Sequence, residues 1–199
     1  MAAAAAALQR GEVIAYPTET VYGLGVDPDQ EGALQRLIKL KGRPPEKGFI
    51  LLVSSLAQLG QLTPVPLSPL AQQLADRFWP GPLTLVLPAK PGLSSLITGG
   101  LSTVAVRCSS SPLVKALLKL WHKPLISTSA NPYGTPPLTD PAQIDAVLGS
   151  QIGLILPGDG GGDGQPSTIL KVDGDSVVLI REGGLTREVA GEVVSGLVG

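Results

Sequence analysis

The chain has one cysteine, Cys108, and one histidine, His122, among its 199 residues. A single cysteine excludes a disulfide or a cysteine-based zinc site within one chain, and a single histidine excludes a histidine-rich metal site. Little material is left for a Cys/His or Ser/His nucleophile, and the sequence contains no GxSxG motif. We therefore expect a reaction that depends on positioning and charge stabilisation more than on acid–base hydrolysis.

Two common nucleotide-binding motifs are also missing. No GxxxxGK[ST] sequence is present, which excludes a P-loop. The GxG of residues 23–25 lacks the third glycine of a dinucleotide fingerprint. Any nucleotide would therefore have to be bound in another way.

Long apolar runs are absent as well. No segment approaches 18 consecutive apolar residues, and residues 1–12 lack both the basic start and the apolar core of a signal peptide. We expect a short alanine-rich helix there, no membrane partner and a cytoplasmic protein. Charged residues make up 16% and aromatic residues 4%, which fits a compact α/β protein and argues against a disordered or coiled-coil chain.

The order of apolar runs and breakers predicts one α/β domain, residues 1–199, with a twisted mixed sheet. Strands and helices interleave without strict alternation, and no linker divides them. Helices are expected from about 29 to 41, ended by Gly42, and after the N-cap pairs Ser68-Pro69, Ser111-Pro112 and Asp140-Pro141. Strands are expected at 13–16, 49–53 (an apolar run covered on both faces), 83–87, 103–106, 125–127, 153–156, 168–172 and 177–180.

Charge is distributed unevenly, although the formal net charge is only −1. The segment from Arg36 to Lys123 carries eleven Lys or Arg residues and two acids, a charge of +9, whereas the rest of the chain carries −10. This asymmetry favours an anion-binding region. The alternative is that these cations solvate helix faces and do not converge.

The sequence KLKGRPPEKG, residues 39–48, places four cations in ten residues. Glycine and two prolines are expected to hold it extended, so that Lys41 and Arg43 point to one side and Lys47 follows. Arg offers a planar fork to phosphate oxygens, and Lys offers a mobile point charge. We therefore interpret this stretch as a phosphate site; a basic loop in solvent is the alternative.

Three further stretches, residues 16–25, 127–137 and 165–169, are rich in hydroxyl and amide side chains. Such groups at strand ends suit a small polar ligand, and ordinary turn chemistry is the alternative. Asp159 and Asp163 could bind a cation or could lie in a solvated loop.

Taken in order, these segments resemble the threonylcarbamoyl-AMP synthase family (YrdC/TsaC). The resemblance runs from about Val13 to Gly183, and its most specific motifs are Lys41-x-Arg43…Lys47 and Ser129-x-Asn131. It implies the short bacterial single-domain form, a twisted α/β sheet with flanking helices and a concave, basic face. The matching stretches are AYPTETVYGLG, LKGRPPEKGFIL, FWPGPLTLVLPA, STVAVR, PLISTSANPYGTPP and PSTI followed by LIREG.

The resemblance implies a nucleotidyltransferase. It would make L-threonylcarbamoyl-AMP and pyrophosphate from L-threonine, bicarbonate (or CO₂) and ATP, with Mg²⁺. The product would supply N6-threonylcarbamoyladenosine beside the anticodon of tRNA. Implied partners are therefore a downstream threonylcarbamoyl-transfer machinery and tRNA or double-stranded RNA.

The resemblance also implies roles for particular residues, and it assigns no protein side chain to a metal. The catalytic cations would be Lys41, Arg43 and Lys47. Threonine would be contacted by Thr20, Arg107, Ser127 and Ser167, with Arg107 pairing with its carboxylate. ATP would be held by Arg43, Lys47, Thr103, Ser129, Asn131, Pro137 and Arg181.

Two positions depart from the family pattern. Leu52 stands where many relatives have His, which puts a threonine contact there in doubt. Pro137 stands where many have Ser, which leaves at most a backbone carbonyl for ATP.

The alternative from another class is a non-catalytic module that binds double-stranded RNA or tRNA through the basic face. Two Phe and three Tyr are few for stacking on single strands, and hydroxyls clustered with Arg suit a small ligand better. An acyl- or carbamoyl-transferring maturation factor would be expected to be longer and to carry metal-binding motifs.

Overall fold

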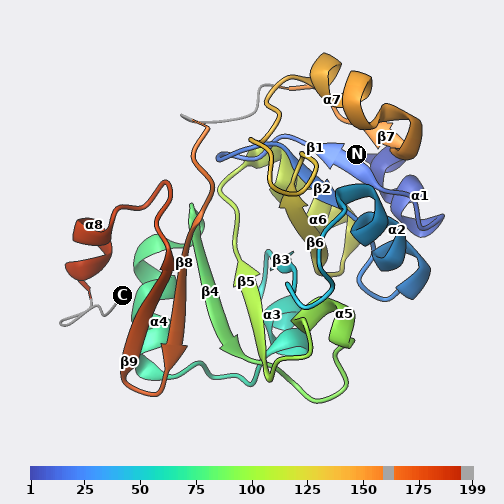
Figure 1. Ribbon diagram of the computed structural model, residues 1–199. Helices are drawn as coiled ribbons and strands as arrows, with labels where there is room; N and C mark the ends of the chain where they lie inside the picture. Colours follow the sequence, from blue (N-terminus) through green and yellow to red (C-terminus); the bar gives the residue numbers. More distant parts are fainter. Residues whose placement is uncertain (159–163, 194–199) are drawn as a thin grey trace.

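A nine-stranded mixed sheet runs through the part of the computed structural model that is described, residues 1–158 and 164–193 (Figure 1). The strands are β1 (Ile14–Tyr16), β2 (Gly23–Gly25), β3 (Ile50–Leu52), β4 (Leu83–Pro88), β5 (Thr103–Arg107), β6 (Leu125–Ser129), β7 (Leu154–Ile155), β8 (Thr168–Asp173) and β9 (Ser176–Arg181). Their order is β7-β1-β2-β6-β3-β5-β4-β8-β9, with parallel and antiparallel neighbours. The predicted α/β fold with a mixed sheet is confirmed.

Helices flank this sheet. They are α1 (Ala2–Gln9), α2 (Glu31–Lys41), α3 (Leu56–Leu62), α4 (Pro69–Phe78), α5 (Ser95–Thr98), α6 (Pro112–Trp121), α7 (Pro141–Leu148) and α8 (Arg187–Gly191), with a 3₁₀ turn at Gly149–Gln151. No helix of the described residues is long and apolar enough to cross a membrane.

Three helices begin where the sequence predicts. Ser68, Ser111 and Asp140 each accept a backbone N–H bond from the first turn of α4, α6 or α7, which satisfies a donor that the helix leaves unpaired. Gly42 ends α2 in the left-handed conformation, with φ 60°. The short elements β2, α3, α5 and α8 are not predicted, because they span too few residues for a clear periodicity.

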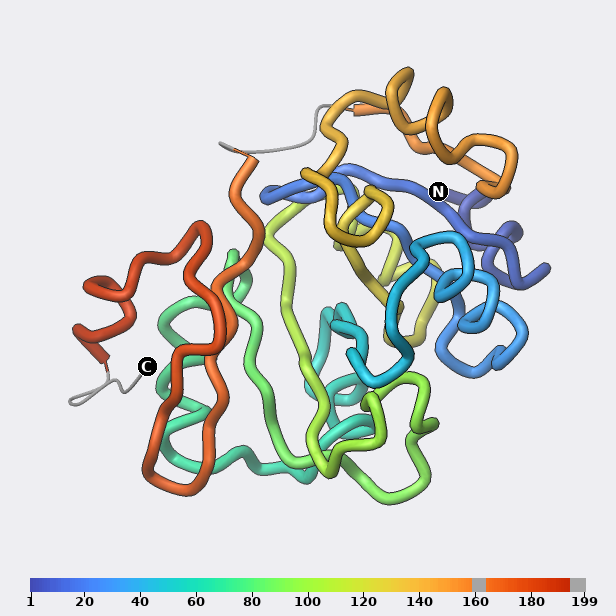
Figure 2. Tube along the Cα trace, viewed as in Figure 1, coloured from blue at the N-terminus to red at the C-terminus, as the bar shows by residue number. Residues whose placement is uncertain are grey.

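The larger core covers one face of the sheet. It joins apolar side chains of α2, α3 and α4 to the inward residues of the central strands; α4 contacts β4 and lies behind β8 and β9 in the view of Figure 2. On the opposite face, α1 and α6 pack against β1, the end of β3 and the start of β6. The rest of that face is left open between these helices and β9 and becomes the floor of a cleft.

Alternation along the central strands determines which side chains reach the cleft. In β5, Thr103, Ala105 and Arg107 line the cleft, whereas Val104 and Val106 are buried in the larger core. In β3, which pairs with β5, Ile50 is partly exposed in the cleft. The prediction that this strand is covered on both faces is therefore wrong at Ile50, because the sheet face beside β5 is open.

Candidate active site

A cleft of about 560 Å³ lies on the open part of the sheet face. Its floor is formed by β3, β5 and β6. Its walls are the loop after β1, the segment from the end of α2 to β3, the loop after β6, and the start of β8 with the end of β9. This volume is typical of a site for small molecules.

All twelve residues that the sequence and the family resemblance single out line this cleft. They are Thr20, Lys41, Arg43, Lys47, Thr103, Arg107, Ser127, Ser129, Asn131, Pro137, Ser167 and Arg181. Leu52, one of the two departures from the family pattern, lines it as well. The structure brings these residues together, while the role of each one stays a prediction.

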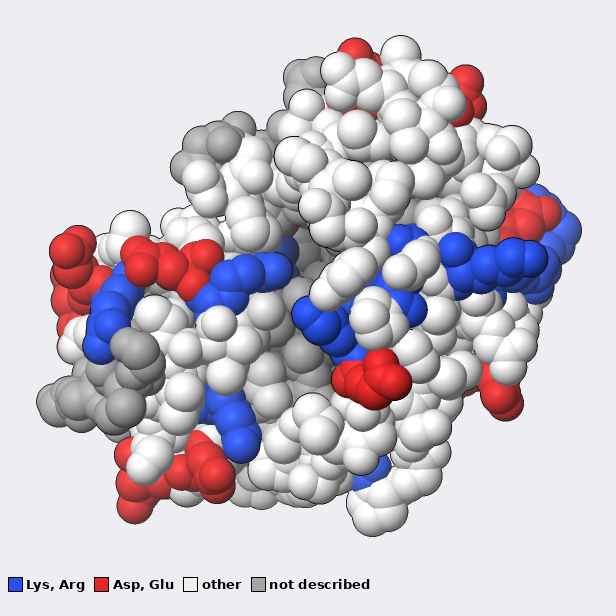
Figure 3. Space-filling model, in the orientation of Figure 1, with Lys and Arg blue, Asp and Glu red and all other residues white. Residues whose placement is uncertain are grey.

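The cleft is basic. Five of the described residues that line it are Lys or Arg, and none is Asp or Glu. Figure 3 shows Lys and Arg side chains around the hollow in the middle of this face. Other cations of the basic segment lie elsewhere: Lys123, for example, forms ion pairs with Asp27 at 3.6 Å and Asp29 at 2.8 Å. The cations of the basic segment therefore converge only in part.

Lys41 is the last residue of α2, in agreement with the helix predicted from about 29 to 41, and it is only 4% exposed. The prediction that Lys41 also lies in an extended segment with Arg43 is wrong, because the helix continues through it. Its Nζ donates hydrogen bonds to the carbonyl oxygen of Ser129 at 2.6 Å and to Oδ1 of Asn131 at 3.0 Å. Burial, and then the nearby charge of Arg43, lower the pKa of Lys41 to about 8. The charge that Lys41 contributes to the cleft therefore changes as the pH passes through about 8.

Arg43 shapes the loop that carries it. Its Nε donates to the carbonyl oxygen of Lys47 at 2.9 Å, and its Nη2 donates to that of Gly48. Nη1 reaches Oγ1 of Thr128 at 3.3 Å, and Cζ lies 4.7 Å from the ring centre of Phe49. The expectation that glycine and prolines alone shape this loop is therefore corrected: the guanidinium holds the loop closed as well.

Residues 46–49 pack tightly against the end of α5. The N–H of Phe49 donates to the carbonyl oxygen of Ile97 at 2.8 Å. Gly99, with φ 66°, comes so close that a Cβ there would lie 2.2 Å from the oxygen of Glu46 and 2.7 Å from the nitrogen of Gly48. Only glycine fits this position without moving the loop.

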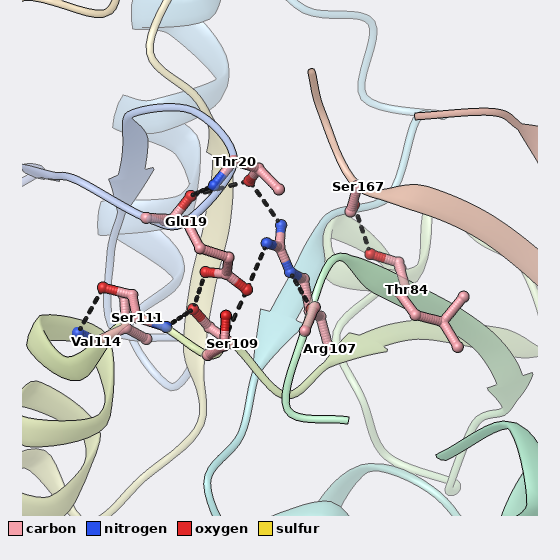
Figure 4. Close-up of polar contacts among 12 residues, drawn as sticks. Glu19, Thr20, Thr84, Arg107, Ser109, Ser111, Val114 and Ser167 are labelled. Atoms are coloured by element: carbon pink, nitrogen blue, oxygen red, sulfur yellow. Dashed lines mark hydrogen bonds and ion pairs between the residues drawn. The ribbon is translucent and has the colours of Figure 1, made fainter. Parts of the chain in front are cut away.

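Arg107 ends β5 and points into the cleft from its floor (Figure 4). It is 6% exposed. Its Nε donates to the carbonyl oxygen of Gly81 at 3.1 Å, its Nη1 donates to Oγ1 of Thr20 at 3.0 Å, and its Nη2 lies 2.8 Å from Oε1 of Glu19. The guanidinium is thus fixed by two different segments, the loop after β1 (Glu19 and Thr20) and the loop before β4 (Gly81).

Ser167, at the entrance to β8, connects two neighbouring strands. Its Oγ lies 2.8 Å from Oγ1 of Thr84 in β4 (Figure 4). Its carbonyl oxygen accepts hydrogen bonds from Nε and Nη2 of Arg181 at 3.2 and 2.7 Å. The end of β9 and the start of β8 therefore present one serine and one arginine to the cleft together.

Three contacts were not predicted from the sequence. Glu19 pairs with Arg107, Thr128 accepts a hydrogen bond from Arg43, and the Nζ of Lys47 lies 5.1 Å from the ring centre of Tyr133. All three partners lie inside the hydroxyl-rich stretches already noted. Glu19 is the only acid of residues 16–25, and a lone acid beside a site rich in cations was the signal that could have found it.

The described residues offer no cluster of three or more His, Cys, Asp or Glu side chains suited to a metal ion. Asp159 and Asp163, the two candidates from the sequence, lie outside the described residues.

Comparisons with known proteins identify the family. The model of the Sua5/YciO/YrdC family, described as "Telomere recombination", matches residues 6–183. A protein of Photobacterium profundum named threonylcarbamoyl-AMP synthase is 44% identical over 173 residues, which is 86% of this chain and 94% of the relative.

Two solved structures extend the comparison to the fold. P. abyssi Sua5, in a crystal structure complexed with L-threonine, is 37% identical with a TM-score of 0.92; the match covers 98% of this chain but only 57% of the P. abyssi chain. E. coli YciO is 28% identical with a TM-score of 0.82, covering 91% of this chain and 87% of that one. Because the family model spans residues 6–183 and the synthase of P. profundum is 44% identical over most of both chains, the chain belongs to the Sua5/YciO/YrdC family.

Proposed function

We propose that the protein synthesises L-threonylcarbamoyl-AMP from L-threonine, bicarbonate or CO₂, and ATP, with release of pyrophosphate. The observation that carries this proposal is the single cleft, in which hydroxyl groups and a buried arginine suited to an amino acid meet cations suited to a triphosphate. Similarity to the synthase of P. profundum and to the threonine complex of P. abyssi Sua5 supports the same reaction.

The amino acid would occupy the end of the cleft around Arg107. The guanidinium is buried and held in place, so it would pair with the threonine carboxylate without first having to be ordered. Thr20, Ser127 and Ser167 would supply hydroxyl groups for the rest of the molecule.

The nucleotide would occupy the other end, around Thr103. Arg107 lies four residue steps after Thr103 along β5, which at ~3.3 Å per step is about 13 Å and leaves room for both substrates. The phosphates would be held by Arg43, Lys47 and Arg181. Thr103, Ser129, Asn131 and the backbone of Pro137 would line the remainder.

The chemistry then needs two bond-forming steps. The threonine amine, in its neutral form, adds to the carbon of CO₂ with loss of a proton, or to that of bicarbonate with loss of water, and becomes a carbamate. A carbamate oxygen attacks the α-phosphorus in line, and the bond to the departing pyrophosphate breaks. Fixed cations stabilise the charge that develops on the phosphates, and Lys41 completes the positive lining.

A Mg²⁺ ion held by the protein does not fit the cleft, because the described lining residues include no carboxylate and Mg²⁺ prefers oxygen ligands. We propose that Mg²⁺ enters with the substrate, as the magnesium complex of ATP.

The product would serve tRNA modification through a downstream threonylcarbamoyl-transfer machinery. Because ATP and tRNA are found in the cytoplasm, we propose that location.

The non-catalytic RNA-binding alternative is less well supported. The basic cleft has the size of a small-molecule site, and hydroxyl groups lie in it beside the cations.

Identification of the product tests the proposal. The protein is incubated with ATP, threonine and ¹³C-bicarbonate, and the mixture is analysed by mass spectrometry. Threonylcarbamoyl-adenylate that carries one ¹³C atom is expected. AMP or ADP without the labelled adenylate, even on rapid quenching, would reject the assignment.

A further inference from the structure

We propose that Glu19 is a positioning residue for threonine recognition: it fixes the guanidinium of Arg107 and balances its charge, so that the donors left on Arg107 face the substrate carboxylate. This inference rests on the proposed function and deepens it, because it concerns the same site. Glu19 lies in the loop between β1 and β2 and is not itself among the residues that line the cleft.

Glu19 is also held by the serines that follow β5. Its Oε2 accepts a hydrogen bond from Oγ of Ser109, and its Oε1 accepts the N–H of Ser110 at 2.9 Å (Figure 4). The N–H of Ser111, the N-cap of α6, donates in turn to Oγ of Ser109 at 3.2 Å. The carboxylate is therefore anchored to residues 109–111, which lead into α6.

The carboxylate stays ionised at neutral pH. Burial alone would raise the pKa of Glu19, but the charge of Arg107 and the hydrogen bonds from Ser109 and Ser110 outweigh burial and lower it. The Arg107 and Glu19 side chains are 7% and 18% exposed, so little solvent is available to screen or replace this pair. A guanidinium buried this deeply needs a counter-charge, and Glu19 supplies it.

The pairing leaves hydrogen-bonding capacity on Arg107. A guanidinium has five N–H groups, and Gly81 and Thr20 take one each. Nη2 lies 2.8 Å from Oε1 of Glu19 and forms an ion pair with it, but the geometry is not that of a hydrogen bond. Among the buried side-chain nitrogen and oxygen atoms of the described residues, Nη2 is the one without a hydrogen-bond partner. Glu19 therefore compensates charge without using all the donors.

These contacts predict a specific division of work. Arg107 touches the carboxylate of the amino acid, and Glu19 acts only through Arg107. Loss of the Glu19 charge should therefore weaken threonine binding but leave the ATP end of the cleft intact. A residue that merely supported the fold would affect both substrates, or would affect stability alone.

The test compares Glu19→Gln, Glu19→Asp and Glu12→Gln with the wild type. Glu12 is a matched control, since it also pairs with an arginine, Arg10, at 2.7 Å, but on the exposed surface. Michaelis constants for threonine and ATP are measured by pyrophosphate release, threonine affinity by calorimetry, and folding by thermal denaturation. Glu19→Gln is expected to raise the Michaelis constant for threonine about tenfold or more, with little change in that for ATP. Glu19→Asp is expected to recover part of this loss. Glu12→Gln is expected to have the constants of the wild type.

A double-mutant cycle with Arg107→Lys tests whether Glu19 acts through Arg107. In the Arg107→Lys background, Glu19→Gln is expected to add little to the threonine defect. Additive effects, or an unchanged threonine constant in a folded Glu19→Gln variant, would overturn the inference. If Glu19→Gln does not fold, Glu19→Asp takes its place in the cycle under the same criteria.

The same experiment separates this inference from the proposed function. A wild-type protein that binds threonine and releases pyrophosphate, with a Glu19→Gln variant that does so equally well, would overturn the role of Glu19 alone. A wild-type protein that neither binds threonine nor releases pyrophosphate in its presence would overturn the proposed function and this inference together.

Discussion

The ammonium group of Lys41 donates a hydrogen bond of 3.0 Å to Oδ1 of Asn131, 90 residues further along the chain. The amide nitrogen of Asn131 donates to the carbonyl oxygens of Pro132 at 3.0 Å and Thr135 at 2.5 Å. One side chain thus connects the end of α2 to the loop after β6, and the two most specific motifs of the sequence form one polar unit in the cleft.

Lys41 should give ATP binding a pH dependence. With a pKa of about 8, Lys41 loses its charge as the pH rises through that value, so ATP affinity is expected to fall by about tenfold above it. Bound phosphates favour the charged form, and ATP binding near pH 8 should therefore take up protons. Calorimetry without threonine, from about pH 7.5 to 9.5 in buffers of different ionisation enthalpy, measures both effects.

Lys41→Arg provides the control, because its guanidinium does not titrate in this range. Its ATP affinity is expected to be flat with pH. The wild type should also gain stability between about pH 8 and 10.4, since the unfolded chain binds more protons than the folded one there. A wild-type affinity that does not change with pH would contradict this role of Lys41.

Arg43→Ala should impair both the loop and ATP use. The substitution removes two hydrogen bonds to the loop backbone and the contact with Phe49, so we expect a loss of about 1–2 kcal/mol in stability. Pyrophosphate release should fall by roughly ten- to a few-hundred-fold, with partial recovery in Arg43→Lys. Hydrogen exchange should show faster exchange at residues 43–48. Full activity in Arg43→Ala would mean that the triphosphate binds elsewhere.

Gly99→Ala should displace the basic loop without touching its cations. A Cβ at this position would overlap the backbone of Glu46 and Gly48. We expect the Michaelis constant for ATP to rise by roughly tenfold to a hundredfold, because small displacements of positioning groups are costly. Gly100→Ala is the matched control: Gly100 also has a positive φ, 77°, but has no atom within 4 Å of its Cβ position. Equal effects of the two substitutions would show that backbone strain, not loop displacement, is responsible.

Arg107→Ala should raise the threonine requirement and also destabilise the fold, by about 3 kcal/mol, because Glu19 is left with a buried, unpaired charge. In the folded wild type the pKa of Glu19 is lower than in the unfolded chain, where it is about 4.3. The ionised Glu19 therefore stabilises the fold above a pH of about 4.3, and this stabilisation is lost as the pH falls through the pKa of the folded protein. Acid denaturation of Arg107→Ala should therefore be less steep over this range. An unchanged threonine constant would contradict the placement of the amino acid.

Local signals made much of the fold predictable. The Ser-Pro and Asp-Pro pairs fix the starts of α4, α6 and α7, and Gly42 ends α2, because caps depend on adjacent residues only. The residues of the candidate site were also predictable, but through the family resemblance. The residues of the basic stretch 39–48 by themselves favoured a phosphate site but kept a solvated basic loop as the alternative.

The contacts between distant segments were not predictable. The pairing of Glu19 with Arg107 and the packing of Gly99 against Glu46 depend on the tertiary fold. Ile50 was expected in the core because an apolar run does not reveal which sheet face is left open. Lys41 was expected both at the end of a helix and in an extended segment with Arg43, because periodicity alone does not locate a helix end to the residue.

Pyrophosphate release in omission experiments tests the proposed reaction most directly. The protein is given ATP with threonine and bicarbonate together, and then with each one left out in CO₂-depleted buffer. A synthase whose cleft binds both the amino acid and the triphosphate should release pyrophosphate from ATP only when threonine and bicarbonate are both present. Serine should substitute poorly for threonine. ATP turnover that continues at the same rate without threonine or without bicarbonate would identify a simple ATPase and contradict the proposed function.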